Sequence, residues 1–220
     1  MSAEQFLSEL QNAIESESLY TNADGKPSRV HFDRHLYLPL IAEERELNDE
    51  DVEYSPPPLN QSERELVDNI KSYFESENGK RILSSWRIFL LRNRSRGRGV
   101  GLLSDDRRFF PDFIMWLQND RRQHIAFIEP HGMTREGEPL DDHRVKFHDN
   151  VKEYERELLR ESKRNAVSLH SYVVSSTDLN TLRDLSARAS TREDFHEAGL
   201  FLPNEFELIL NDILSGEDRS

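Results

Sequence analysis

Apolar side chains recur at three- and four-residue intervals in several blocks of the chain, which is the spacing of amphipathic helices. One such block, with Leu66, Val67 and Ile70, predicts a helix over residues 61–76. The same spacing predicts two more helices, over residues 3–17 and 143–162, and a closing helix that contains Phe206, Ile209, Leu210 and Ile213. The helices alternate with shorter apolar runs, so an α/β protein is expected.

Four of these shorter runs have the length and composition of strands, at residues 82–92, 110–117, 123–130 and 168–176. Ile88–Leu91 is apolar on both faces, which favours an interior strand. The polar turn at Asn119 and Asp120 joins the second and third runs into a β-hairpin. HFDRHLYLPL holds a further short strand pattern within an otherwise irregular stretch, residues 18–60.

The order of the elements from residue 60 is helix, strand, hairpin, helix, strand. A strand, a helix and a second strand in succession form a crossover with two parallel strands. The hairpin beside it is antiparallel, so we expect a mixed central β-sheet flanked by helices over residues 60–215. Residues 1–59 are expected to form an N-terminal helix and connector, without a core of their own.

The open end of the predicted hairpin carries acidic and titratable residues. A hairpin brings the ends of its strands together, so Asp112 is expected to lie near Glu129 and His131. Strand alternation puts Glu129 and His131 on one face. Pro130 has no amide hydrogen, so we expect regular pairing to stop there and to leave its carbonyl free as a third oxygen ligand. These groups suit a hard cation such as Mg²⁺ or Mn²⁺.

The spacing of these residues resembles the signature of the PD-(D/E)xK nucleases. Pro111 and Asp112 are followed, a hairpin later, by Glu129-Pro130-His131, with histidine where the family has lysine. Three further blocks, LLRNRSRGRGVGLL, FFPDFIMWL and IAFIEPHGM, follow HLYLPLI and SPPPLNQSERELV in order. Together they resemble the C-terminal nuclease region of bacterial helicase-nucleases akin to type III restriction subunits, from about residue 31 to residue 214.

This resemblance implies an αβββαβ restriction-endonuclease-like core and a metal-dependent endonuclease that cleaves double-stranded DNA. It implies that Asp112 and Glu129 hold the metal, and that a residue at position 131 positions or activates the attacking water. A neutral imidazole accepts a proton near pH 7 but supplies no permanent cation there. The resemblance also implies a helicase or ATPase domain or subunit as a partner, in restriction or phage defence.

An alternative remains open because His131 replaces the lysine. The domain could have lost cleavage and kept its fold for docking to DNA or to the helicase. The resemblance further suggests an extra acid on the first helix, and Glu63 is the better candidate because it shares the apolar stripe, whereas Glu65 lies on the polar side. Glu63 also suits a capping box with Asn60, which is a purely structural role.

A basic stretch directly precedes the acidic hairpin. Residues 40–79 hold twelve acids and three bases, whereas residues 80–98 hold seven bases and no acid. The functional interpretation is a clamp on DNA phosphates, for which the candidate residues are Arg92, Asn93, Arg94, Arg96 and Arg98. A solvated loop is an equally good interpretation of the charge run, and Arg92 and Asn93 suit structural hydrogen bonds equally well.

The composition bears on nucleic-acid affinity, on metal sites and on membrane contact. The net charge of -13 over 220 residues opposes simple non-specific affinity for nucleic acid. The chain has no cysteine, which excludes disulfides and thiolate metal sites and suits a cytoplasmic protein. No apolar run approaches the ~20 residues of a membrane helix, so we expect no membrane contact. His143 and His148 do not have the four-residue spacing of a helical zinc pair and are expected at the surface.

Overall fold

The computed structural model describes residues 29–30, 40–41, 59–93, 100–104, 107–133, 137–162 and 167–215. The helix expected over residues 3–17 lies outside these residues, as do Arg94, Arg96 and Arg98. No helix in the described part of the chain is long and apolar enough to cross a membrane.

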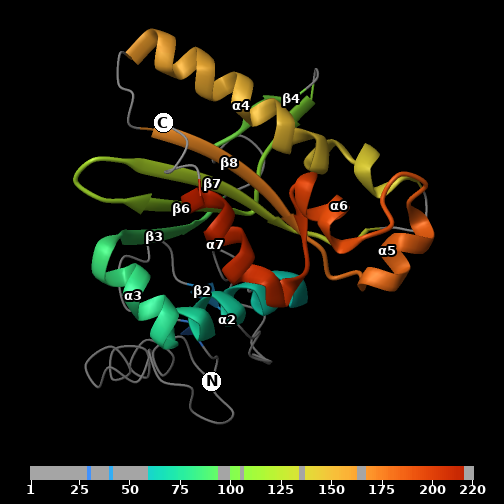
Figure 1. Ribbon diagram of the computed structural model, residues 1–220, viewed down its shortest axis with the longest axis horizontal. Helices are drawn as coiled ribbons and strands as arrows, with labels where there is room; N and C mark the ends of the chain where they lie inside the picture. The colour runs from blue at the N-terminus through green and yellow to red at the C-terminus, as the bar shows by residue number, and fades with distance from the viewer. Residues whose placement is uncertain are drawn as a thin grey trace, which may run out of the picture.

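A five-stranded mixed sheet forms the centre of the protein (Figure 1). Its strands, in spatial order, are β3 (Arg87–Arg92), β6 (Phe113–Gln118), β7 (Gln123–Pro130), β8 (Val167–Val174) and β9 (Leu200–Phe201). The pairs β3–β6 and β6–β7 are antiparallel, and β7–β8 and β8–β9 are parallel. The structure therefore confirms the α/β class with a mixed sheet flanked by helices.

The hairpin of β6 and β7 is closed by the predicted turn. Gln118 pairs with Gln123, and the side-chain Oδ1 of Asn119 accepts hydrogen bonds from the backbone N–H groups of Arg121 and Arg122. An asparagine that bonds the backbone two and three residues further on fixes such a turn locally. The register then places Phe113 opposite Ile128 at the open end of the hairpin.

The parallel pair β7–β8 is joined through the long helix α4 (His143–Ser162), as the crossover pattern predicted. A short 3-10 turn, η2 (Pro139–Asp141), precedes α4. On the face of the sheet beneath α4, Phe147 and Val151 pack against Ile114, Phe127 and other apolar side chains. In Figure 1 this helix lies above the sheet.

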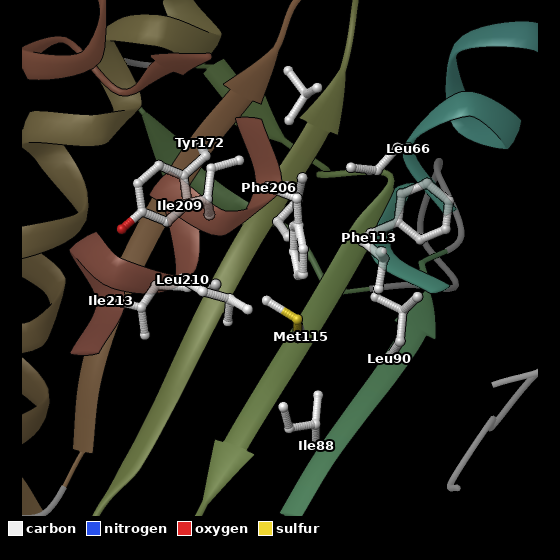
Figure 2. Packing of buried hydrophobic residues seen from close by; sticks show 14 of the residues in the cluster. Leu66, Ile88, Leu90, Phe113, Met115, Tyr172, Phe206, Ile209, Leu210 and Ile213 are labelled. Atoms are coloured by element: carbon white, nitrogen blue, oxygen red, sulfur yellow. The ribbon is translucent and has the colours of Figure 1, made fainter. Parts of the chain in front are cut away.

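The opposite face of the sheet carries the largest core. It is covered by α2 (Gln61–Glu75), α3 (Glu77–Ser85) and α7 (Phe206–Ser215). Figure 2 shows side chains of α2 and α7, including Leu66 and Phe206, pointing toward Phe113 and Met115 of β6. The apolar stripe predicted on the first helix is the reason for this arrangement, because Leu66, Val67 and Ile70 are fully buried.

Two short helices, α5 (Leu179–Leu185) and α6 (Arg192–Glu197), lie near the end of β8 with a separate small core that contains Val173, Leu182 and Phe195. The 3-10 turn η3 (Pro203–Glu205) leads into α7. Two minor antiparallel pairs complete the described elements: β1 (Arg29–Val30) with β2 (Leu40–Ile41), and β4 (Leu102–Ser104) with β5 (Arg107–Phe109).

Two predictions about the first strand are wrong. Residues 82–85 belong to α3, which begins after Ser76, whose side chain caps the N–H of Gly79, and ends before Trp86. The strand is also an edge strand of the described sheet, with β6 as its one partner there. Its apolar residues are covered by layers above and below the sheet, and burial on both faces does not require a strand on both sides.

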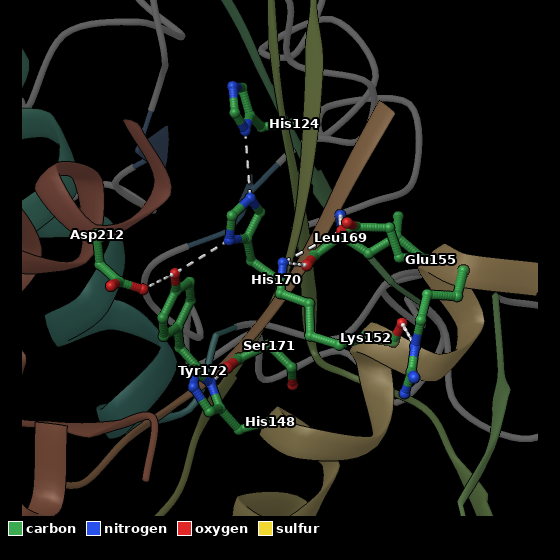
Figure 3. Close-up of polar contacts among 10 residues, drawn as sticks. His124, His148, Lys152, Glu155, Leu169, His170, Ser171, Tyr172 and Asp212 are labelled. Atoms are coloured by element: carbon green, nitrogen blue, oxygen red, sulfur yellow. Dashed lines mark hydrogen bonds and ion pairs between the residues drawn. The ribbon is translucent and has the colours of Figure 1, made fainter. Parts of the chain in front are cut away.

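The part of the β8 edge that does not pair with β9 is covered by side chains of α4 (Figure 3). Leu169 donates its backbone N–H to Glu155 Oε2 at 2.6 Å, and its carbonyl accepts from Lys152 Nζ at 2.7 Å. His148 Nδ1 lies 2.7 Å from the carbonyl of Ser171. Positions 148, 152 and 155 share one helix face, so α4 lines this edge; His148 is therefore not the surface residue that was expected.

Candidate functional site

The candidate site lies at one end of the sheet, where several elements start or stop together. The parallel strands β7 and β8 both end there, β3 ends beside them and β6 begins there. Ligands in open α/β sheets commonly bind outside the carboxyl ends of parallel strands. The first turn of α2 reaches this edge through Ser62, and the first turn of α4 reaches it through Arg144.

Asp112 and Glu129 lie beside each other at this edge, as the hairpin predicted. The backbone N–H of Asp112 donates to Glu129 Oε2 at 3.0 Å. The contact follows from the register, because Phe113 and Ile128 are opposite each other and the next residue out on each strand must also be adjacent. Glu129 is only 8% exposed, and Asp112 is half-buried.

Both carboxyl groups have strongly raised pKa values. Burial, and then the negative charge of Glu63, raises the pKa of Asp112 from 3.8 to about 6. Burial, and then the charge of Asp112, raises the pKa of Glu129 from 4.5 to about 8. The charge of Asp112 disfavours ionisation of Glu129, and the charge of Glu63 disfavours ionisation of Asp112. A divalent cation would stabilise the ionised form of both acids.

Arg144, which the sequence analysis did not single out, is the cation in contact with this pair. Its Nε lies 3.4 Å from Glu129 Oε1. The same guanidinium donates through Nη1 to Asp142 Oδ2 at 3.0 Å, and the backbone N–H of Arg144 donates to Asp142 Oδ1 at 2.8 Å. Asp142 therefore caps the start of α4 and also holds the arginine side chain.

Glu63 is engaged on the other face of the sheet. It completes the predicted capping box, since it accepts from the N–H of Asn60, and its Oε2 lies 2.9 Å from Arg92 Nη2. Both members of this pair are buried, with Glu63 5% and Arg92 8% exposed. Arg92 is therefore the buried counter-ion of Glu63. A contact with DNA would require it at the surface, where it does not lie.

Asn93 is likewise occupied within the protein. Its side chain donates to the carbonyls of Val100 and Pro111, both at 2.8 Å, and accepts from the N–H of Val100 at 2.9 Å. These bonds tie the end of β3 to the segment that precedes β6. The structural role considered for Asn93 is the one the geometry supports, and its side chain has no free donor for a phosphate.

The expectation that regular pairing stops at Pro130 is wrong. Pairing continues through this residue, which lies opposite Val174, and the next N–H, of His131, donates to the Val174 carbonyl at 3.0 Å. Backbone groups of successive residues point to opposite sides of a strand. An N–H at Pro130 would therefore have pointed to the β6 side, beyond the first residue of β6, where no strand residue pairs with it. Its carbonyl is approached by Ser62 Oγ at 3.4 Å, a weak contact that leaves a lone pair for a metal.

His131 is half-buried on the β7 side of the site. Burial, and then the positive charge of Arg144, lowers its pKa below 6.5. The imidazole is therefore neutral at pH 7 and accepts a proton, but it does not carry the charge of the lysine it replaces.

The residues present fit a Mg²⁺-like ion that keeps several of its waters. Among the described residues no group of three or more histidine, cysteine, aspartate or glutamate side chains is arranged around a common metal position. Asp112 and Glu129 offer carboxylate oxygens and Pro130 offers a carbonyl that a weak 3.4 Å contact occupies. Mg²⁺ commonly binds one or two carboxylates and keeps several waters, so this small donor set is sufficient.

A second polar cluster lies in the interior, on the α7 side of the sheet (Figure 3). His124 Nδ1 lies 3.2 Å from His170 Nε2, His170 Nδ1 lies 3.4 Å from the hydroxyl of Tyr172, and that hydroxyl donates to Asp212 at 2.5 Å. Burial lowers the pKa of His124 to about 4 and that of His170 to about 2. Both imidazoles are therefore buried and neutral at pH 7.

Comparison with known proteins adds no relative. No family model matches the chain, and neither a curated protein nor a solved structure matches it.

Proposed function

We propose that this chain is a metal-dependent DNA endonuclease with a PD-(D/E)xK-like core. The observation that carries the proposal is the hydrogen bond from the backbone N–H of Asp112 to Glu129, which brings a half-buried and a buried acid together at the carboxyl end of a parallel pair of strands. Such a pair with raised pKa values is uncommon unless a function requires it. With α3 and the β4–β5 pair as insertions, the order α2, β3, β6, β7, α4, β8 also agrees with the αβββαβ order of that family.

In this proposal Asp112, Glu129 and the Pro130 carbonyl hold Mg²⁺ or Mn²⁺, which polarises the phosphate and activates a bound water. His131, as a neutral base two residues after Glu129, orients or deprotonates that water. Glu63, paired with Arg92, acts on Asp112 through its charge and holds the edge of the sheet in place. Arg94, Arg96 and Arg98 remain candidates for contacts with the DNA backbone.

The biological setting is also part of the proposal. Double-stranded DNA would be delivered by a helicase or ATPase domain or subunit, in a cytoplasmic restriction or phage-defence system. The support is the ordered series of sequence blocks around the hairpin.

A non-catalytic docking module is the second candidate. The observation that favours it is the ion pair between Arg144 and Glu129, together with histidine at position 131. An arginine beside the acid can replace a metal as the neutralising charge, in which case the pair would be purely structural.

A plasmid-nicking assay with Mg²⁺ or Mn²⁺ separates the two candidates. Wild type is expected to cut in a metal-dependent manner, Asp112→Asn is expected to be inactive, and Asp149→Asn, an exposed acid on α4, should cut like wild type. His131→Lys is expected to retain or raise the activity, since it restores the family's residue. No cutting by wild type, with or without a helicase partner, would leave the docking module as the function.

A further inference from the structure

The carboxylate pair has two permanent cations near it in the described structure. Arg92 and Arg144 are the two arginines whose charges lower the pKa of Asp112. The side chain of Arg92 is 10% exposed and lies 2.9 Å from Glu63. The side chain of Arg144 is 24% exposed and lies at the edge of the sheet, on the face where α4 begins. Arg144 is therefore the cation that an incoming ligand can reach.

Arg144 is held in a way that leaves part of its guanidinium available. An arginine has five N–H donors in a planar fork. One side of the fork is fixed by the hydrogen bond from Nη1 to Asp142. The Nε side faces Glu129 at 3.4 Å, which is an ion-pair contact longer than a good N–H···O hydrogen bond. Within the described residues, no hydrogen bond from Nη2 of Arg144 is present.

A metal ion at the carboxylate pair would leave Arg144 available to bind a phosphate. A divalent ion held there would neutralise Glu129, so the 3.4 Å contact would no longer be needed to compensate that charge. The guanidinium would stay held by Asp142 at the same edge of the sheet, where it could meet an anion beside Glu129. Guanidinium groups bind phosphate oxygens through two parallel N–H···O bonds, which the neutral His131 cannot provide.

We propose that Arg144 binds the phosphate that is cleaved and supplies the permanent positive charge that the lysine of the signature provides elsewhere. This inference rests on the proposed nuclease function. It assigns to α4, a helix outside the sequence signature, a residue that touches the substrate. Asp142 is then a positioning residue, because it fixes the guanidinium and the start of the helix together.

The test uses binding and cleavage together. The full chain is titrated with a labelled DNA duplex in Ca²⁺, which occupies oxygen sites and is used to hold back cleavage, at several salt concentrations. Single-turnover cleavage is then measured in Mg²⁺. Arg144→Gln is compared with Arg156→Gln, which removes the same charge from an exposed position about 18 Å further along α4.

The inference predicts that Arg144→Gln lowers the slope of log K against log salt by about 1, because one phosphate contact is lost. It also predicts a loss of about 100-fold or more in the cleavage rate. Arg156→Gln is expected to change neither quantity. A purely structural arginine would affect stability and rate but would leave the salt slope of the folded protein unchanged.

The combined results distinguish a failure of the proposed Arg144–phosphate contact from a failure of the proposed nuclease function. If wild type cuts and Arg144→Gln has the same slope and rate, Arg144 has no phosphate role although the nuclease proposal stands. If wild type binds with the predicted slope difference but does not cut, the nuclease fails and the phosphate contact is supported. Absence of both binding and cutting overturns both. Should Arg144→Gln fail to fold, Arg144→Lys serves: cleavage slowed about tenfold supports the bidentate phosphate contact, and a wild-type salt slope together with a wild-type cleavage rate refutes it.

Discussion

Replacing Asp112 by asparagine is expected to stabilise the metal-free protein while it removes the proposed metal site. Most substitutions of a half-buried hydrogen-bonding residue destabilise. Here the carboxylate lies next to Glu129 and within the field of Glu63, so the wild-type charge is unfavourable. Asparagine keeps the shape of the side chain, and the backbone N–H that Glu129 accepts from is unchanged.

The magnitude follows from the raised pKa. A change from 3.8 to about 6 corresponds to roughly 3 kcal/mol of unfavourable free energy for the ionised form. Part of that cost persists because an amide must also be buried. We therefore expect Asp112→Asn to raise the free energy of unfolding by about 1 to 2 kcal/mol above pH 6 in EDTA.

The stability gained by Asp112→Asn should increase as the pH rises. An acid whose folded pKa is raised binds more protons when folded, so its destabilising effect is absent below the unfolded pKa of 3.8 and complete above about 6. The difference between variant and wild type should therefore be present at about pH 8 and small at about pH 4. Urea denaturation at both pH values measures it, with Asp149→Asn expected to stay within about 0.5 kcal/mol.

Metal addition should reverse the order of stabilities. At a hundred times its Kd, Mn²⁺ is expected to stabilise wild type by about 2.7 kcal/mol and the Asp112 variant by much less. If Asp112→Asn is less stable than wild type at about pH 8 in EDTA, the carboxylate is a structural group that Arg144 and Arg92 already satisfy, and the reasoning from charge repulsion is wrong.

Other parts of the fold give further expectations. Arg92→Met should cost about 3 kcal/mol in urea denaturation, because Glu63 is left buried without its counter-ion; a loss below about 1 kcal/mol would show that water reaches the acid. Gly79→Ala should destabilise by about 1 to 3 kcal/mol although alanine favours helices, because the new methyl group would overlap the backbone carbonyl of Tyr73; a stabilised variant would mean that α3 shifts freely. Through His124, wild type is expected to lose up to about 2 kcal/mol of stability between about pH 7 and pH 5, because the unfolded histidine takes up a proton near 6.5 and the folded one only near 4. His124→Phe should abolish this loss, and equal acid sensitivity of both proteins would refute the reasoning.

The elements that periodicity predicted well are those with a complete local signal. The helix over 143–162 and the hairpin closed at Asn119 have an apolar repeat together with a start or turn residue. Residues 82–85 were assigned to a strand because Ile82 and Leu83 precede a strongly apolar run. The actual boundary depends on the cap at Ser76 and the close packing of Gly79 on α2, which is a tertiary contact.

The approach of Asp112 to Glu129 could be predicted because a hairpin connects them. Arg144 was missed, although a signal for it exists: a crossover helix begins near the end of the strand that it follows, so the first turn of α4 must lie near Glu129. The contact between Ser62 and the Pro130 carbonyl could not have been predicted, since it depends on how α2 docks against the sheet 68 residues away in the chain.

The side chains of α4 along β8 have a consequence for how the protein behaves in concentrated solution. An exposed strand edge is a template to which a strand of another molecule can add. Lys152, Glu155 and His148 occupy the backbone groups of Leu169 and Ser171 that such a strand would need. Resistance to intermolecular sheet growth therefore depends on a helix that stays folded and docked, because loss of α4 from this edge would expose the same backbone groups to a strand of another molecule.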